Sequence, residues 1–318
     1  MPDWFTQLTF LADDRPATVR AGIVVHGDRL ALPDGRTLVA GHLTTPALAD
    51  LPAPPPGPAR LRVSEVVANV QDLHRDARNA GALFQVASQF NLLEMVSPRA
   101  TPDQGIARYA HDATQGPACA MACAAGTIWR NYLVPVAGQV GQSADHQLDM
   151  MADFGAALGP DPLWDMVNGY LLPRPGGLAR ITQRLRDDDS LRGLVRVGLQ
   201  QDTQVTLDGA GHLVSQVYCS ALPIAYATER LADWEPFARL ILTAAYLATL
   251  SLATRNAART GNNRLFLTHL GGGAFGNPPG WIIDAMADAL TAFAPAALDV
   301  RIVSYRAPDP VNRPLSRP

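Results

Sequence analysis

Residues 265–281, LFLTHLGGGAFGNPPGW, decide the fold class of this chain. An apolar strand pattern ends there in three consecutive glycines, and a helix pattern begins a few residues later. Glycine lets the backbone approach a ligand closely, and the start of a helix carries partial positive charge. The segment predicts an anion-binding loop at the end of a strand. The alternative is a glycine-rich turn whose Phe275 only fills the core.

The segments around this loop alternate between strand and helix patterns. Strand patterns cover 61–70, 82–88, 194–207, 212–226 and 299–305, and helix patterns cover 117–129, 236–259 and 281–293. We expect Pro236 in the first turn of the second helix, and surface loops over 138–150 and 158–178. Alternating strands and helices predict an α/β fold, a sheet with helices on both faces.

The chain divides into three parts by composition. Residues 19–44 read as short strands with turn signals at Gly27-Asp28 and Pro33-Asp34-Gly35. The proline-rich stretch 51–60 must be extended or a loop. We therefore predict a β-rich N-terminal extension over 1–60, packed on a main domain over 61–306, and a loose Pro-rich tail over 307–318.

Composition excludes several classes of chemistry and of partner. All 26 basic residues are arginine, so no lysine is available for a Schiff base or a P-loop. A formal net charge of −3 gives no general attraction to nucleic acid or to an anionic membrane. Three cysteines are no disulfide framework, and the apolar run between Arg239 and Arg255 is short for a membrane span. We expect a soluble, cytoplasmic protein without membrane or nucleic-acid partners; its oligomeric state stays open.

Residues 84–94, FQVASQFNLLE, place polar side chains at the end of an apolar strand. Gln89, Asn91 and Glu94 could read sugar hydroxyls and orient a water molecule. Glu94 is one of only four glutamates in the chain. The alternative is the ordinary use of Asn in a turn or a cap.

Two further carboxylates stand at candidate positions. Asp112 precedes the Gly116-Pro117 pair that opens an Ala-rich helix. Either Asp112 or Thr114 caps that helix, or Asp112 acts as a general base beside an anion there. Asp202 lies in a strand pattern, LQQDTQVT.

Motifs for metals and for common cofactors are missing from the sequence. Cys119 and Cys123 stand one helical turn apart near His111, but neither a CxxC pair nor HExxH occurs. GxSxG, GxGxxG and GxxxxGK[ST] are absent as well. We therefore expect no metal and no cofactor.

The glycine loop resembles the second ligand loop of the macrodomain superfamily, a strand followed by a loop with a GxFG core and a helix. FQVASQFN resembles the strand that ends in an asparagine in macrodomains and in poly(ADP-ribose) glycohydrolases. Together with ASQFNLLEM, TQGPACA, RNYLVP and SALPIAY, these motifs make the chain over about 60–306 similar to the glycohydrolase-like branch of that superfamily, which includes the MavL-like bacterial ADP-ribosyl hydrolases.

This resemblance implies a mixed sheet between helices that binds ADP-ribose across its strand ends. The glycine loop would wrap the diphosphate and the distal ribose, Asn91 would contact that ribose, and the helix after Gly116 would face the phosphates. The expected ligand-binding residues are Gln89, Asn91, Gln115, Gly116, Ser220, Gly271, Gly272, Gly273, Ala274, Phe275, Gly276 and Asn277.

The family's catalytic Asp or paired Glu has no recognisable counterpart after Asn91. The candidates for the catalytic carboxylate are therefore Glu94, Asp112 and Asp202. The resemblance implies an ADP-ribosyl hydrolase that cleaves the C1″ link between ADP-ribose and a modified side chain, with arginine as one candidate, so its partner would be ADP-ribose or an ADP-ribosylated protein. A non-catalytic ADP-ribose reader and an interaction protein without a nucleotide are the alternatives.

Overall fold

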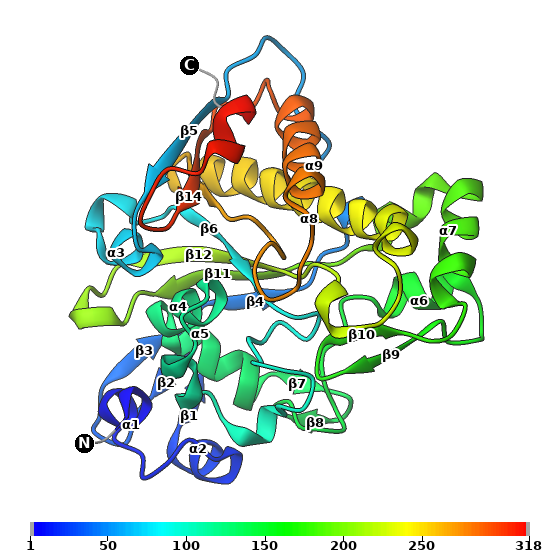
Figure 1. Cartoon of the computed structure of the whole chain (residues 1–318). Helices are drawn as coiled ribbons and strands as arrows, with labels where there is room; N and C mark the ends of the chain where they lie inside the picture. Colours follow the sequence, from blue (N-terminus) through cyan, green and yellow to red (C-terminus); the bar gives the residue numbers. More distant parts are fainter. Residues whose placement is uncertain (1–2, 316–318) are drawn as a thin grey trace.

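A seven-stranded mixed sheet forms the centre of the computed structural model, which describes residues 3–315 (Figure 1). The strands from β12 to β5 are parallel to one another, whereas β11 pairs antiparallel on both of its sides. The predicted mixed α/β sheet is confirmed. In spatial order the strands are β4 (His42–Thr44), β11 (Gly198–Gln204), β12 (Leu213–Cys219), β6 (Leu83–Ala87), β13 (Arg264–Leu267), β14 (Asp299–Ser304) and β5 (Arg62–Val67).

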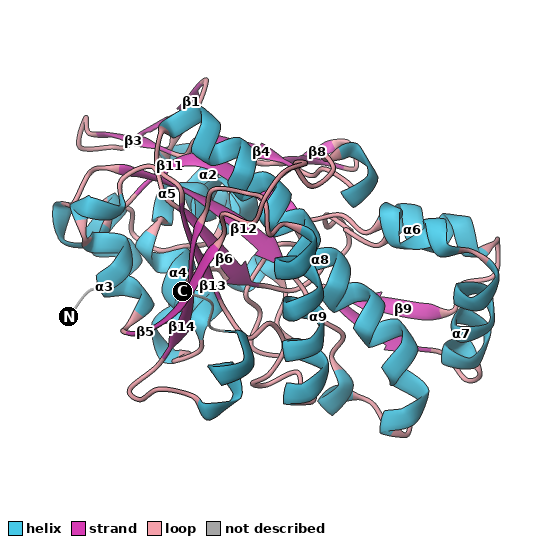
Figure 2. Ribbon diagram, turned by 90° about the horizontal axis from the view of Figure 1, so that it is seen from above, coloured by secondary structure: helices cyan, strands magenta, loops and turns pink. Residues whose placement is uncertain are grey.

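Helices cover both faces of this sheet (Figure 2). α8 (Leu231–Thr260) and α9 (Pro279–Ala292) pack together on one face, and α3 (Val70–Arg75), α4 (Gln115–Ala122) and α5 (Ala124–Ile128) lie on the other. α8 is long and apolar enough to cross a membrane, but 72% of its most apolar window is buried, as expected of a core helix. It begins at Leu231, so Pro236 lies inside the helix and the predicted start was wrong.

The N-terminal region contains α1 (Trp4–Thr9), α2 (Pro16–Gly22) and a small sheet of β1 (Val24–His26), β2 (Arg29–Ala31) and β3 (Thr37–Val39). Both predicted hairpin turns occur. Residues 19–22 are helical rather than extended, because Pro16 starts α2 at its first turn. β4 then pairs with β11, so this region adds an edge strand to the main sheet. The division into separate parts stays a prediction.

Two segments predicted as surface loops contain regular structure. Residues 138–150 include β8 (Gln139–Val140), which pairs with β7 (Pro135–Val136). Residues 158–178 form a hairpin of β9 (Trp164–Val167) and β10 (Tyr170–Pro173), which is flanked by α6 (Ala152–Leu158) and α7 (Gly177–Asp187). The predicted helix over 117–129 is split at Cys123 and continues into a π-helical turn at Trp129–Leu133.

The described part of the tail is packed against the sheet, so the expectation of a loose tail was wrong there. Asn312 is buried, and its amide donates to Glu65 Oε1 at 2.7 Å. The Asp309 backbone N–H donates to the same oxygen at 2.7 Å. One carboxylate within β5 thus holds the tail. Residues 316–318 lie outside the described residues.

β6 and β13 separate before they end, and this separation opens the sheet. They pair only at Leu83–Leu265 and Phe84–Phe266, whereas β6 stays paired with β12 up to Ala87. The Gln115 side chain replaces the missing strand: its oxygen accepts from the Ala87 N–H at 2.9 Å, and its amide donates to the Gln85 carbonyl at 2.8 Å. The β6 backbone therefore remains hydrogen-bonded beside an open space.

We predict that Q115L lowers the free energy of unfolding by about 1–3 kcal/mol, because it leaves two backbone groups of β6 without a partner. Urea denaturation measures the change, and Q183L on the exposed face of α7 is the matched control. Equal stability of Q115L and Q183L would show that the side-chain bridge does not support β6.

Candidate functional site

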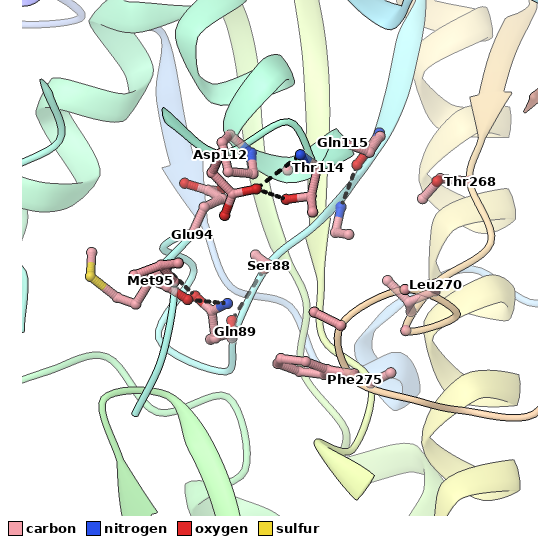
Figure 3. A pocket seen from close by; sticks show the side chains of 18 of the residues that line it. Ser88, Gln89, Glu94, Met95, Asp112, Thr114, Gln115, Thr268, Leu270 and Phe275 are labelled. Carbon is pink, nitrogen blue, oxygen red and sulfur yellow. Dashed lines mark hydrogen bonds between the residues drawn. The ribbon is translucent and has the colours of Figure 1, made fainter. Parts of the chain in front are cut away.

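A cavity of about 300 Å³ lies at the carboxyl ends of β6, β12 and β13 (Figure 3). Three segments that are distant in sequence supply most of its wall: the loop after β6, the start of α4, and the glycine loop after β13. This is the edge at which open α/β sheets bind ligands. Of the predicted site residues, the cavity is lined by Gln89, Glu94, Asp112, Gln115, Gly116, Gly271, Gly273, Ala274 and Phe275.

The glycine loop is shaped by close backbone packing. Gly271 has a φ of +73°, and a Cβ there would lie 2.4 Å from the Ala221 Cβ. Gly273 differs, because a Cβ on it would meet no atom within 4 Å, and Gly273 lines the cavity. The loop therefore folds against the segment that follows β12 at Gly271 and presents bare backbone to the cavity at Gly273.

Asn277 holds this loop from behind. It is buried, and its amide donates to the Leu222 carbonyl at 2.9 Å and to the Gly271 carbonyl at 3.3 Å. Its backbone N–H also donates to Gly271 O at 3.0 Å. Asn277 is thus part of the loop's internal structure and does not line the cavity, in contrast to its predicted role.

Phe275 forms one wall of the cavity together with two tyrosines. Its ring centroid lies 5.2 Å from that of Tyr170 and 5.9 Å from that of Tyr226. Both tyrosines line the cavity, and neither was among the predicted residues. Tyr170 opens β10, in a segment predicted as a loop, so no pattern in the sequence connected it with the glycines.

The start of α4 lies directly against the end of β6. A Cβ on Gly116 would lie 2.1 Å from the Ala87 carbonyl oxygen, so only glycine allows this approach. The helix start, with its partial positive charge, consequently faces the cavity.

Asn91 supports the loop after β6 instead of lining the cavity. Its amide donates to Gln147 Oε1 at 2.8 Å, and its oxygen accepts from the Leu93 N–H at 3.1 Å. Asn91 is completely buried, and Gly169 packs against its side chain. The structure therefore supports the turn alternative for this residue.

Three more predicted ligand contacts lie outside the lining of this cavity. Ser220 is buried and its hydroxyl donates to the Ala221 carbonyl at 2.9 Å. Gly276 packs against Ala225, and Gly272 faces a second cavity on the other side of the loop.

Glu94 is the buried carboxyl of the site. Its side chain is 2% exposed, it lines the cavity, and neither of its oxygens has a hydrogen-bond partner among residues 3–315. The nearest opposite charge is the Arg130 guanidinium, at 3.9 Å. Burial raises the pKa of Glu94 to about 8, and Arg130 opposes this rise only in part. Glu94 is therefore mostly protonated at neutral pH.

Asp112 lies beside Glu94 but in contact with solvent. It is partly exposed, and its Oδ1 accepts from the Thr114 N–H at 2.9 Å and from the Thr114 hydroxyl at 2.7 Å (Figure 3). Thr114 occupies the N-cap of α4 and its side chain makes no capping hydrogen bond, so Asp112 braces the residue before the helix without capping the helix itself, and it also lines the cavity. The site combines one buried and one hydrated carboxyl group.

Asp202 is not brought to this site. It lies in a bulge of β11, where both of its oxygens accept from Arg259 at 2.6 and 2.7 Å. Arg259 stands at the end of α8, just before β13 begins, and so at the sheet edge opposite the cavity. The sequence did not show this separation. Asp202 lies in β11 and Ser220 follows β12, and the two strands form an ordinary hairpin whose pattern does not tell which residues reach the cavity.

Comparisons with known proteins find structural similarity only. No family model and no curated protein matches the chain. The chain is similar to solved poly(ADP-ribose) glycohydrolases: one from Thermomonospora curvata (15% identity, 91% of each chain covered, TM-score 0.43), its complex with the inhibitor ADP-HPD (17%, 92% and 93%, 0.42), and one from Deinococcus radiodurans in complex with ADP-ribose (12%, 81% and 85%, 0.41). At these identities, the role of a single side chain must be inferred from the cavity of this chain itself.

The raised pKa of Glu94 makes stability depend on pH. Between the ordinary value of 4.5 and about 8, the unfolded chain releases this proton while the folded chain keeps it. Wild-type stability therefore falls as pH rises through that window. We predict that E94Q is more stable than wild type by about 1–3 kcal/mol at pH 8 and that this advantage disappears near pH 4.5.

Urea denaturation at both pH values measures this difference. E235Q, on α8, controls for the Glu-to-Gln substitution itself. A constant difference between E94Q and wild type from pH 4.5 to pH 8 would contradict the raised pKa.

Proposed function

We propose that this protein binds ADP-ribose and hydrolyses the C1″ bond between its distal ribose and a modified protein side chain. The observation that carries the proposal is Glu94, a buried carboxyl group without a hydrogen-bond partner that faces a cavity beside a glycine loop and a helix start. A carboxyl kept neutral at the edge of a ligand pocket is suited to donate a proton.

The cavity offers the contacts that a nucleotide sugar needs. No arginine side chain lines it, so backbone N–H groups of the glycine loop and the start of α4 would hold the diphosphate. Phe275, Tyr170 and Tyr226 supply an aromatic wall for a ribose or a base. An interaction protein without a ligand would have these loops filled by side chains, and the open cavity speaks against that alternative.

The two carboxyl groups divide the chemistry between them. Glu94 donates its proton to the leaving atom as the bond from C1″ to that atom breaks. Asp112, which is hydrated, accepts a proton from the water whose oxygen forms the new bond to C1″. Because Glu94 is buried and Asp112 is partly exposed to solvent, one can act as the acid and the other as the base at the same pH.

Arginine is the modified side chain that the charges of the cavity favour. Asp112 is the partly exposed acidic side chain of the cavity, and no arginine lies among the lining residues to pair with it. A guanidinium leaving group would be attracted there.

Hydrolysis by matched carboxyl variants tests the proposed reaction. We predict that wild type releases ADP-ribose from a mono-ADP-ribosylated arginine peptide and that E94Q and D112N lower kcat about 10²–10⁴-fold. The reaction should slow as pH rises through about 8, where Glu94 loses its proton.

D202N is the control, because Asp202 is paired with Arg259 away from the cavity, and it should keep wild-type turnover. ADP-ribose binding without release from arginine, glutamate or poly(ADP-ribose) substrates would instead identify a reader.

The glycine loop can be tested by binding alone. We predict that G273A weakens ADP-ribose binding about tenfold or more by calorimetry while Tm stays the same, because the added methyl meets only the ligand's space. G280A, on the exposed first turn of α9 and also without neighbours within 4 Å, should leave the affinity unchanged. Equal affinities of the two variants would remove the loop from the binding site.

A further inference from the structure

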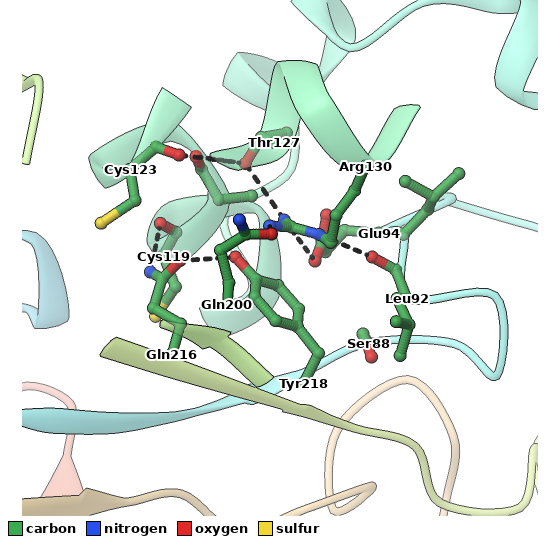
Figure 4. A network of polar contacts seen from close by, with 12 residues as sticks. Ser88, Leu92, Glu94, Cys119, Cys123, Thr127, Arg130, Gln200, Gln216 and Tyr218 are labelled. Carbon is green, nitrogen blue, oxygen red and sulfur yellow. Dashed lines mark hydrogen bonds and ion pairs between the residues drawn. The ribbon is translucent and has the colours of Figure 1, made fainter. Parts of the chain in front are cut away.

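Arg130 is a buried cation directly behind the proposed proton donor (Figure 4). Its side chain is fully buried, and it belongs to the π-helical turn at Trp129–Leu133. The proposed reaction assigns it no role. A buried arginine that is not part of the ligand-facing surface needs a structural or an electrostatic reason.

One reason lies in the turn that carries Glu94. Leu92, two residues earlier, has a φ of +64°, a conformation that is strained for a leucine. Arg130 Nε donates to the Leu92 carbonyl at 3.1 Å, and the Leu92 side chain fills the space over Gly198. The strained turn is thus held through both the backbone and the side chain of Leu92. Glu94 comes two residues later, so its position depends on this turn.

A second reason is the fixed distance of the charge. The guanidinium donates to Thr127 Oγ1 at 3.1 Å and to Gln200 Oε1 at 3.4 Å, and it lies 3.6 Å from the Tyr218 ring centroid. These contacts keep it 3.9 Å from Glu94 Oε1, without a hydrogen bond between the two groups. The cation is therefore close enough to stabilise a carboxylate but cannot swing onto it.

The other titratable groups that face Glu94 carry no positive charge. They are Tyr109, whose hydroxyl accepts from the Glu94 N–H at 3.1 Å, Asp112 just after the helical turn that contains Tyr109, Tyr218 in β12 and Cys119 in α4. Burial and Asp112 raise the pKa of Glu94, while Arg130 and Tyr109 lower it. Among residues 3–315, Arg130 is thus the one arginine within 4 Å of the Glu94 carboxyl group.

We propose that Arg130 is a positioning residue for Glu94: it holds the strained turn that aims the carboxyl group, and it supplies the fixed charge that lets this group release its proton. This inference rests on the proposed role of Glu94 as proton donor. Without Arg130, Glu94 would keep its proton more firmly and would be a weaker acid.

The low glutamate content of the chain allows a direct test. Selective ¹³C-glutamate labelling of the full chain gives carboxyl resonances from only four residues, and E94Q identifies that of Glu94. The titration midpoint of Glu94 is then measured in wild type, R130M and R130K. Met and Lys are similar in length and differ in charge, so the pair separates charge from packing.

We expect R130M to raise the Glu94 midpoint by about one unit or more. In the hydrolysis assay, R130M should lower kcat about tenfold or more at pH 7, change KM less than about threefold, and shift the alkaline limb of the pH profile upward. R130K should return the midpoint toward the wild-type value but recover only part of kcat, because an ammonium cannot keep the fork of contacts around Leu92. R130Q replaces R130M if the latter does not fold.

An unchanged Glu94 midpoint in R130M, or R130K behaving like R130M, would overturn the role of Arg130. Failure of the proposed function gives a different result: wild type releases no ADP-ribose, whatever the midpoint does in R130M.

Discussion

The backbone of β6 must stay hydrogen-bonded after β13 has moved away from it, and the rest of the site depends on how this is achieved. The Gln115 side chain occupies the place of the lost strand by bonding Ala87 and Gln85. Because a side-chain amide fills much less volume than a whole strand, space remains between the ends of β6 and β13. The same contact draws the start of α4 against β6, where Gly116 permits the approach. A cavity and a helix start are therefore produced together.

The pKa of Glu94 in this space is set by two opposing effects, burial of the carboxyl group and the charge of Arg130. Removing Glu94 from water favours its neutral form, and the guanidinium of Arg130 limits how far this goes. A direct salt bridge would leave a permanent carboxylate, while an apolar pocket without Arg130 would leave a very weak acid. The surrounding contacts of Arg130 with Leu92, Thr127 and Gln200 keep its distance constant, so the balance is built into the packing.

Many polar residues near the site hydrogen-bond the backbone of the surrounding loops. Asn91, Asn277 and Gln115 were all predicted as ligand contacts, and each satisfies buried main-chain groups of an irregular loop. Such loops cannot use ladder hydrogen bonds, so side-chain amides replace them. From sequence, an amide that binds a ligand and an amide that holds a loop look the same. Tyr170 is the opposite case: it was not predicted, and it reaches the cavity from a hairpin that had no strand signal.

The sequence by itself determined the alternating α/β order, the glycine loop after a buried strand, and the polar segment that contains Glu94, because hydrophobic periodicity and glycine chemistry are local properties. Only the tertiary structure decided which carboxyl groups share the cavity. Glu94 and Asp112 come together because β6 and α4 meet at Gln115, whereas Asp202 faces Arg259 at the other edge of the sheet. Protonation was decided at the same level, since the pKa of a carboxyl group follows from its burial and its neighbours, which no stretch of sequence contains.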